Sequence, residues 1–229
     1  LAQQRRQGHE VHLLTLTRGE ATRQRERLGL SKEEMGETRV REMQNVAEAL
    51  DLSSLTVEKY PDGELAELNP LVLEEEIADH IHRVEPEVVV TYPVHGVSGH
   101  PDHLVTHAIV KRVVCQLRAD GATTPRRIAF FTLRPPTDDA DRPSHLQHSP
   151  SALVDCVLAP TDTDIDTGQT ALHCYETYRP VIEKHRPLSG AADGIAFELF
   201  GEDHDPPLTD LTAHLPSASD AAPLPPFSE

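Results

Sequence analysis

With 229 residues, the chain has room for one sizeable α/β domain, which we expect over residues 1–200. Its 38 acidic residues outnumber its 21 basic residues and give a formal net charge of -17, which argues against a surface that binds nucleic acid or an anionic membrane. No apolar run approaches the roughly 20 residues that span a bilayer, and the three cysteines lack CxxC spacing. We therefore expect a cytoplasmic protein without a membrane span, a nucleic-acid partner or a disulfide framework.

The chain opens with a pattern that predicts the end of a helix followed by a parallel strand. Residues 1–8 carry arginines near a closing glycine, which is typical of a helix C-terminus. Residues 10–17 are nearly continuously apolar, as in the centre of a parallel sheet. A helix that leads into a parallel strand normally follows an earlier strand. We therefore expect that the first strand of the domain is missing from this chain, which leaves unpaired backbone on its neighbours.

Helical and strand patterns then alternate. We predict a long loop or lid at 18–37, helices at 38–50, 69–84, 101–117 and 166–185, and strands at 55–60, 86–92, 127–133, 152–158 and 195–200. Residues 135–150 form an irregular polar insertion, and residues 201–229 are a Pro/Asp/Ala-rich tail, loosely packed or disordered from Pro206. The alternation of strands and helices predicts an α/β fold.

The most informative stretch is Gly96-Val97-Ser98-Gly99-His100-Pro101-Asp102-His103, between a strand and a helix. Its glycines allow a tight turn, His100 occupies a capping position, and Pro101 suits the first helical position. In open α/β sheets, ligands bind beyond the carboxyl end of a strand. His100, Asp102 and His103 are therefore delivered to a candidate site.

Several readings of these three residues remain open. Both histidines could bind a metal such as Zn²⁺, or one could be a ligand and the other an imidazole acting on substrate. Asp102 could stabilise the helix dipole or orient a histidine, and a plain helix cap with surface residues is also possible.

Other histidines are assigned lesser roles. We expect His107, one turn deeper in the helix, to pack or to support the site. His80 and His82 are expected at the surface. His145 and His148 repeat the HxxH spacing, but no strand precedes them and we assign them no role.

The Gly99–His103 run, together with residues 14–20 and 39–42, resembles the LmbE-like, or PIG-L, family of zinc-dependent de-N-acetylases. The resemblance covers roughly residues 1–117. It implies a three-layer α/β/α Rossmann-like fold with a mostly parallel sheet. It also implies a hydrolase that uses Zn²⁺ to remove the acetyl group from a small-molecule N-acetylated amino sugar or its conjugate, of the N-acetylglucosaminyl type.

The same resemblance gives roles to residues of the central stretch. His103 is implied as a zinc ligand, and His100 as the group that stabilises the tetrahedral intermediate or protonates the leaving amine. Asp102 is implied to tune His100. Ser98 stands where some relatives have a tyrosine that helps to bind the oxyanion.

Arg39 and Asp62 are implied to contact the sugar. The other two zinc ligands and the general base belong to an AHPDDE-type motif that the printed sequence does not contain, and we expect it just before Leu1. We therefore expect the 229-residue chain alone to be inactive and poorly folded. The alternative is a degenerate, non-catalytic relative that binds a carbohydrate or another small molecule.

Overall fold

The structure is a computed structural model that describes residues 1–134 and 145–215. By their internal contacts, the residues form two compact units. Unit 1 comprises Leu1–Leu65 and Ala159–Gly194, and unit 2 comprises Ala66–Leu158 and the chain from Ile195 onward. In the part of the chain that is described, no helix is both long and apolar enough to cross a membrane.

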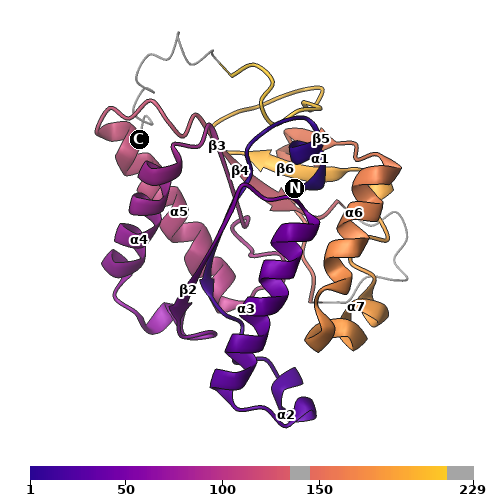
Figure 1. Cartoon of the computed structure of the whole chain (residues 1–229). Helices are drawn as coiled ribbons and strands as arrows, with labels where there is room; N and C mark the ends of the chain where they lie inside the picture. Colours follow the sequence, from indigo (N-terminus) through magenta and orange to yellow (C-terminus); the bar gives the residue numbers. More distant parts are fainter. Residues whose placement is uncertain (135–144, 216–229) are drawn as a thin grey trace. The chain divides into compact units, whose positions relative to one another are not determined.

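Unit 1 contains one small parallel sheet and five helices among its described residues. These are α1 (Ala2–Arg6), β1 (His12–Thr17), α2 (Gln24–Leu28), α3 (Lys32–Ala49), β2 (Ser54–Tyr60), α6 (Asp162–His173) and α7 (Arg179–His185). Strands β1 and β2 pair in parallel, with His12 opposite Ser54. Val46 and Leu50 of the α3 segment pack against Ala171 of α6, which fixes these two helices side by side (Figure 1).

Two helices of unit 1 begin earlier than the sequence analysis predicts. Helix α3 begins at Lys32, inside the expected loop, because Ser31 and Glu34 form a capping box in which each side chain accepts the other's backbone N–H. Thr161 and Asp164 form a second capping box, so α6 begins at Asp162. The single helix expected over 166–185 is instead two helices, α6 and α7, separated by a 3₁₀ turn.

Unit 2 contains the strand and helix that flank the central stretch. Its regular elements are α4 (Pro70–Val84), β3 (Val88–Thr91), α5 (Pro101–Ala119), β4 (Arg127–Thr132), β5 (Cys156–Leu158) and β6 (Ile195–Leu199). The sheet order is β3-β4-β6-β5, with β3 parallel to β4 and β6 antiparallel to both of its neighbours. Helices α4 and α5 pack side by side (Figure 1). The α/β fold is confirmed, although β6 runs antiparallel to the other strands of its sheet.

Strands β1 and β3 each pair on one side only among the described residues. Within unit 1, β1 pairs with β2, and within unit 2, β3 pairs with β4. Val90 lies in a run of three valines, a pattern typical of a strand covered on both faces, yet it is 48% exposed. Each unit therefore presents a strand edge that could accept another strand.

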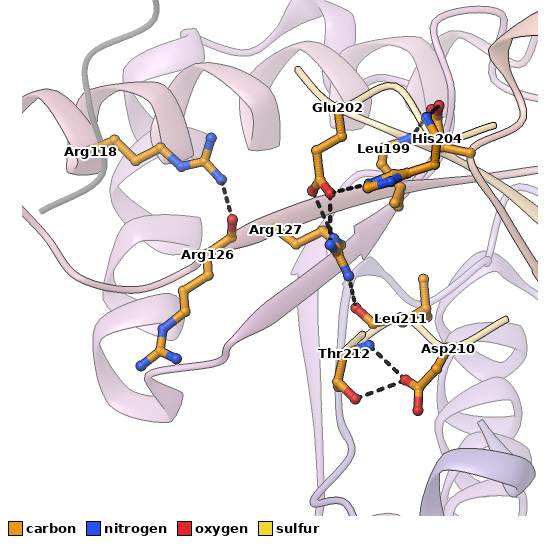
Figure 2. Close-up of polar contacts among 10 residues, drawn as sticks. Arg118, Arg126, Arg127, Leu199, Glu202, His204, Asp210, Leu211 and Thr212 are labelled. Atoms are coloured by element: carbon orange, nitrogen blue, oxygen red, sulfur yellow. Dashed lines mark hydrogen bonds and ion pairs between the residues drawn. The ribbon is translucent and has the colours of Figure 1, made fainter. Parts of the chain in front are cut away.

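The segment after β6 is anchored to β4 by a buried arginine (Figure 2). Arg127 is 2% exposed, and its Nε and Nη2 each donate to the Glu202 carboxylate at 2.7 Å. Its Nη1 donates to the carbonyl oxygen of Leu211. Burial disfavours the charged form of Glu202, but the hydrogen bonds from Arg127 and His204 outweigh this effect and lower the pKa of its carboxyl.

Leu208 and Leu211 are accordingly buried in the core of unit 2. The expectation of a loosely packed tail from Pro206 is therefore wrong as far as residue 215, because the tail contributes apolar side chains and a carbonyl acceptor to the core. Residues 216–229 of the expected tail, and residues 135–144 of the expected insertion, lie outside the described residues.

Candidate functional site

The central stretch forms a tight loop between β3 and the first turn of α5. His100 is the N-cap of α5, and its Nδ1 accepts a hydrogen bond from the backbone N–H of Asp102 at 3.3 Å. Gly96 and Gly99 have φ of 64° and 68°, the left-handed region that favours glycine. The strand, glycine loop and helix start predicted from the sequence are thus all present.

The two histidines of this loop differ in the nitrogen that carries the proton. Nδ1 of His103 lies 2.9 Å from the carbonyl oxygen of Gly96, which can only accept, so Nδ1 is protonated and the lone pair of the neutral ring is on Nε2. His100 is the reverse case. Its Nδ1 accepts from Asp102, so the proton of the neutral ring is on Nε2. With their ring centroids 5.2 Å apart, one imidazole is suited to bind a metal and its neighbour to donate a hydrogen bond.

His103 is held on several sides. The Tyr92 ring stacks on it, with the centroids 4.0 Å apart and the planes 8° from parallel. Ser98 Oγ lies 3.3 Å from His103 Nδ1, which brings this predicted residue into the site. A side chain at Gly96 would place its Cβ 3.0 Å from the Cβ of His103, so only glycine allows this approach. Asp102 is buried, and its charge adds to the effect of burial in raising the pKa of Tyr92.

Two histidines outside the loop, His107 and His80, are buried in the fold. His107 is buried, its Nδ1 donates to the carbonyl oxygen of Tyr92 at 2.8 Å, and its ring packs on Phe130. His80 was expected at the surface but is only 8% exposed, because its side of α4 faces the core, whereas His82 is exposed.

Arg39 lies in unit 1 on α3. Its guanidinium stands 4.8 Å and 4.5 Å from the ring centroids of Tyr175 and Tyr178. Nη1 also contacts the Glu42 carboxylate at 3.3 Å. The Nε atom is buried and has no hydrogen-bond partner among the described residues. The side chain is therefore rigidly held with one donor still to be satisfied.

Asp62 lies in the turn after β2, also in unit 1. Its carboxylate accepts from the Ala21 N–H at 2.8 Å and from the Thr17 hydroxyl at 3.3 Å, so both oxygens serve the loop after β1. Glu20 of that loop accepts from the Asp62 N–H through Oε1, while its buried Oε2 has no partner within the described residues. Sequence reasoning gave Glu20 no site role, although it ends the segment 14–20 that carries part of the family resemblance.

In the ranges 1–134 and 145–215, no three His, Cys, Asp or Glu side chains are grouped so as to hold a metal ion. A catalytic zinc site usually takes about three protein ligands, and a ligating histidine typically donates its other N–H to a carbonyl. His103, with its Nδ1–H on Gly96, fits one such position.

Comparison with known proteins gives a consistent family. The family model described as "PIG-L: GlcNAc-PI de-N-acetylase" matches residues 1–114. The 1D-myo-inositol 2-acetamido-2-deoxy-alpha-D-glucopyranoside deacetylase of Kineococcus radiotolerans is 30% identical in an alignment 142 residues long, which covers 50% of this chain and 39% of that protein. The chain thus spans less than half the length of this relative.

Solved structures share the fold. A deacetylase of teicoplanin biosynthesis superposes with a TM-score of 0.63 at 15% identity, covering 86% of this chain and 89% of that one. The 4-carboxy-2-hydroxymuconate hydratase of Pseudomonas putida superposes with a TM-score of 0.56 at 16% identity, covering 89% of both chains. Because one neighbour is a hydratase, the fold alone does not specify the reaction.

Proposed function

The chain belongs to the PIG-L family of GlcNAc-PI de-N-acetylases, and from this premise we propose that it removes the acetyl group from an N-acetylated amino-sugar conjugate. The observation that carries the proposal is that the two neighbouring imidazoles at the start of α5 are opposite tautomers. Hydrolysis of an amide is helped by one group that activates the carbonyl and another that stabilises the oxyanion with a hydrogen bond. His103, as a metal ligand, and His100, as a hydrogen-bond donor, are suited to these separate tasks.

In this proposal, His103 holds a zinc ion through Nε2. When bound, Zn²⁺ acts as a Lewis acid that polarises the acetyl carbonyl and acidifies a water molecule. The neutral His100 ring would donate a hydrogen bond from its Nε2–H to the developing oxyanion, and the Asp102 N–H on Nδ1 keeps the ring in this donating tautomer. Ser98 helps to orient the His103 ring through the contact between its Oγ and His103 Nδ1.

The sugar contacts are proposed for residues of unit 1. Arg39 and Glu20 each have a buried polar atom without a partner among the described residues, and a hydroxylated ligand could satisfy both. Asp62 positions Glu20 through its own backbone N–H and is assigned a supporting part in this contact. The general base and the remaining zinc ligands are those of the AHPDDE-type motif, so we propose the activity for the protein in which that motif accompanies this chain.

The test separates the two histidines in a protein that carries the motif. His103→Ala is expected to abolish zinc binding together with acetate release. His100→Ala is expected to keep about one zinc ion per chain while kcat falls about 10²–10³-fold, because only the hydrogen-bond donor to the oxyanion is lost. Zinc content and release of acetate from N-acetylglucosamine conjugates are measured, with His82→Ala on the exposed side of α4 as the control. Unchanged zinc binding in His103→Ala would contradict the proposal.

A further inference from the structure

We propose that His95 is a positioning residue that fixes the backbone of the loop carrying His100 and His103. His95 lies in the same β3–α5 connection as the site but touches neither histidine in any contact that the structure gives. Its effect passes through Val97, Ser149 and Glu198. The loop geometry is a property of unit 2 by itself, while its consequence for zinc binding rests on the proposed function.

The His95 ring is the centre of a directional chain of hydrogen bonds. Its Nδ1 accepts from the backbone N–H of Val97 at 3.1 Å, so in the neutral ring the proton is on Nε2. Nε2 lies 3.2 Å from Ser149 Oγ, which can accept a hydrogen bond from it. The Ser149 hydroxyl in turn donates to the Glu198 carboxylate on β6. Because the hydroxyl proton of Ser149 is directed to Glu198, His95 is the donor in its contact with Ser149, and its tautomer is determined.

Ser149 is a firm anchor for this chain. It is 0% exposed, and its backbone N–H donates to Thr132 Oγ1 on β4 at 3.0 Å. Ser149 and Glu198 thus connect the His95 ring to two neighbouring strands of the sheet, β4 and β6. A side chain held in this way can impose a conformation on the backbone to which it is bonded.

Val97 needs such support. Its φ is 62°, a left-handed conformation that is rare for a β-branched residue and costs roughly what one or two hydrogen bonds contribute. Both of its backbone polar groups are fixed. The N–H donates to His95 Nδ1, and the carbonyl oxygen accepts from the Gln147 N–H at 2.7 Å. The hydrogen bond from Gln147 connects Val97 to the segment 147–149, which also contains Ser149, the partner of the His95 ring. Both backbone contacts of Val97 are therefore supported by this one segment.

This arrangement reaches the site through the residues on either side of Val97. Gly96 supplies the carbonyl oxygen that accepts from His103 Nδ1, and Ser98 supplies the hydroxyl next to the same atom. If Val97 left its conformation, both acceptors would move and the His103 ring would lose the contacts that define its tautomer. The segment 145–149, to which the sequence analysis assigned no role, therefore supports the site from outside it.

The surroundings of His95 favour the neutral ring that this role requires. Burial lowers the pKa of His95, the charge of Glu198 acts in the opposite direction, and His148 and His107 lower it further. A protonated Nδ1 could not accept from the Val97 N–H.

The test compares two amides that each replace one nitrogen of the ring. His95→Asn places an oxygen near the position of Nδ1, where it can accept from the Val97 N–H as in an Asx turn. His95→Gln extends to the position of Nε2 and keeps only the contact with Ser149. Hydrogen exchange of the Val97 amide and the ¹⁵N shifts of the His103 imidazole are measured in the full chain. Zinc affinity is measured in the protein that carries the AHPDDE-type motif, with His82→Asn as the matched surface control.

We expect His95→Asn to retain slow exchange at Val97 and the His103 tautomer, whereas His95→Gln loses both and weakens zinc binding about tenfold or more. Rescue by Asn but not by Gln is a result that general loss of packing would not produce, and thermal melting of each variant identifies any that fails to fold. The inference is overturned if His95→Gln leaves the Val97 and His103 signals unchanged, or if Asn is as damaging as Gln. A wild-type protein that binds no zinc would count against the proposed function alone, because the loop signals are read without metal.

Discussion

At the scale of single residues, the tautomers of His100 and His103 are determined by their backbone hydrogen-bond partners. Nδ1 of His103 faces the carbonyl oxygen of Gly96 and carries the proton, whereas Nδ1 of His100 accepts from the N–H of Asp102 and carries none. Residue type alone would make these two side chains equivalent. Their different local partners leave one neutral ring with a lone pair on Nε2 and the other with an N–H at Nε2, within one turn of the same helix.

The stack of Tyr92 on His103 leads to a prediction about its ring. Tyr92→Phe keeps the stacked face and should leave zinc affinity within about twofold, while Tyr92→Leu should weaken it by the roughly 0.5–1.5 kcal/mol that an aromatic pair contributes. Zinc affinity is measured by competition with a chelator in the protein that carries the AHPDDE-type motif. Equal affinities in the Phe and Leu variants would show that the stack does not hold His103, and a loss in Tyr92→Phe would assign the effect to the phenol.

At the scale of elements, helix caps carry much of the local specification in unit 1. Asp164 accepts from the backbone N–H and the hydroxyl of Thr161 at the start of α6, and it forms an ion pair with Arg6 of α1. The side-chain hydrogen bonds from Arg6 hold the pKa of Asp164 well below its usual range, although burial opposes them. One carboxylate thus caps a helix and connects two segments that are distant in sequence.

The depressed pKa of Asp164 makes the stability of unit 1 sensitive to acid. Because the folded form binds its proton less readily than the unfolded form, the stabilisation is complete above the unfolded pKa of about 3.9 and is lost as pH falls toward the folded value. Asp164→Asn should lower the free energy of unfolding at pH 7 by about 1 kcal/mol through the weakened cap. Below about pH 4, the wild-type and variant curves should converge.

Chemical denaturation between pH 2 and pH 7 measures the difference in the free energy of unfolding between wild type and Asp164→Asn. At pH 7 this difference should be on the order of the contribution of one helix cap. Asp166→Asn is the matched control, since Asp166 is an exposed carboxylate of the same helix. Parallel pH curves for wild type and Asp164→Asn would contradict the linkage, and an equal effect of Asp166→Asn would assign it to general charge.

The elements that the sequence predicts well are those with strong local signals. The Asn69-Pro70 and His100-Pro101 pairs mark the starts of α4 and α5, and both helices begin there. The start of α3 was missed because its capping box lies in a charged stretch without apolar periodicity. Leu208 and Leu211 were assigned to a loose tail because the contacts that bury them, with β4 and its neighbours, are distant in sequence.

The candidate site divides in the same way. His100, Asp102 and His103 are adjacent in sequence, so a motif is enough to predict that they lie together. The parts that hold them cannot be found from spacing, because Ser149 and Glu198 reach His95 only through the packing of the sheet. The buried Oε2 of Glu20 is likewise visible only once the loop after β1 is folded.

At the scale of the whole molecule, we expect the unpaired strand edges to matter for the proposed reaction, as the two histidines do. The fold occurs in a deacetylase and in a hydratase, so chemistry depends on the side chains placed at the strand ends. Among the described residues, β1 and β2 each have an unpaired edge in the sheet of unit 1, and β3 lies at one edge of the sheet of unit 2. A strand that carries the AHPDDE-type motif would pair with one of these strand edges and would bring the remaining metal ligands at the same time. We therefore expect folding and metal binding to be coupled.

This coupling gives a prediction for the 229-residue chain with and without such a segment. We expect the chain alone to release no acetate and to melt at a lower temperature than the extended protein, which should bind about one zinc ion per chain. A third protein, in which the histidine and aspartates of the added motif are replaced by Ala, separates the two effects. If strand pairing and ligation are distinct, it regains most of the thermal stability but no zinc and no activity. Zinc-dependent acetate release from the chain alone would refute the requirement for the motif, because His103 would then have found its partners elsewhere.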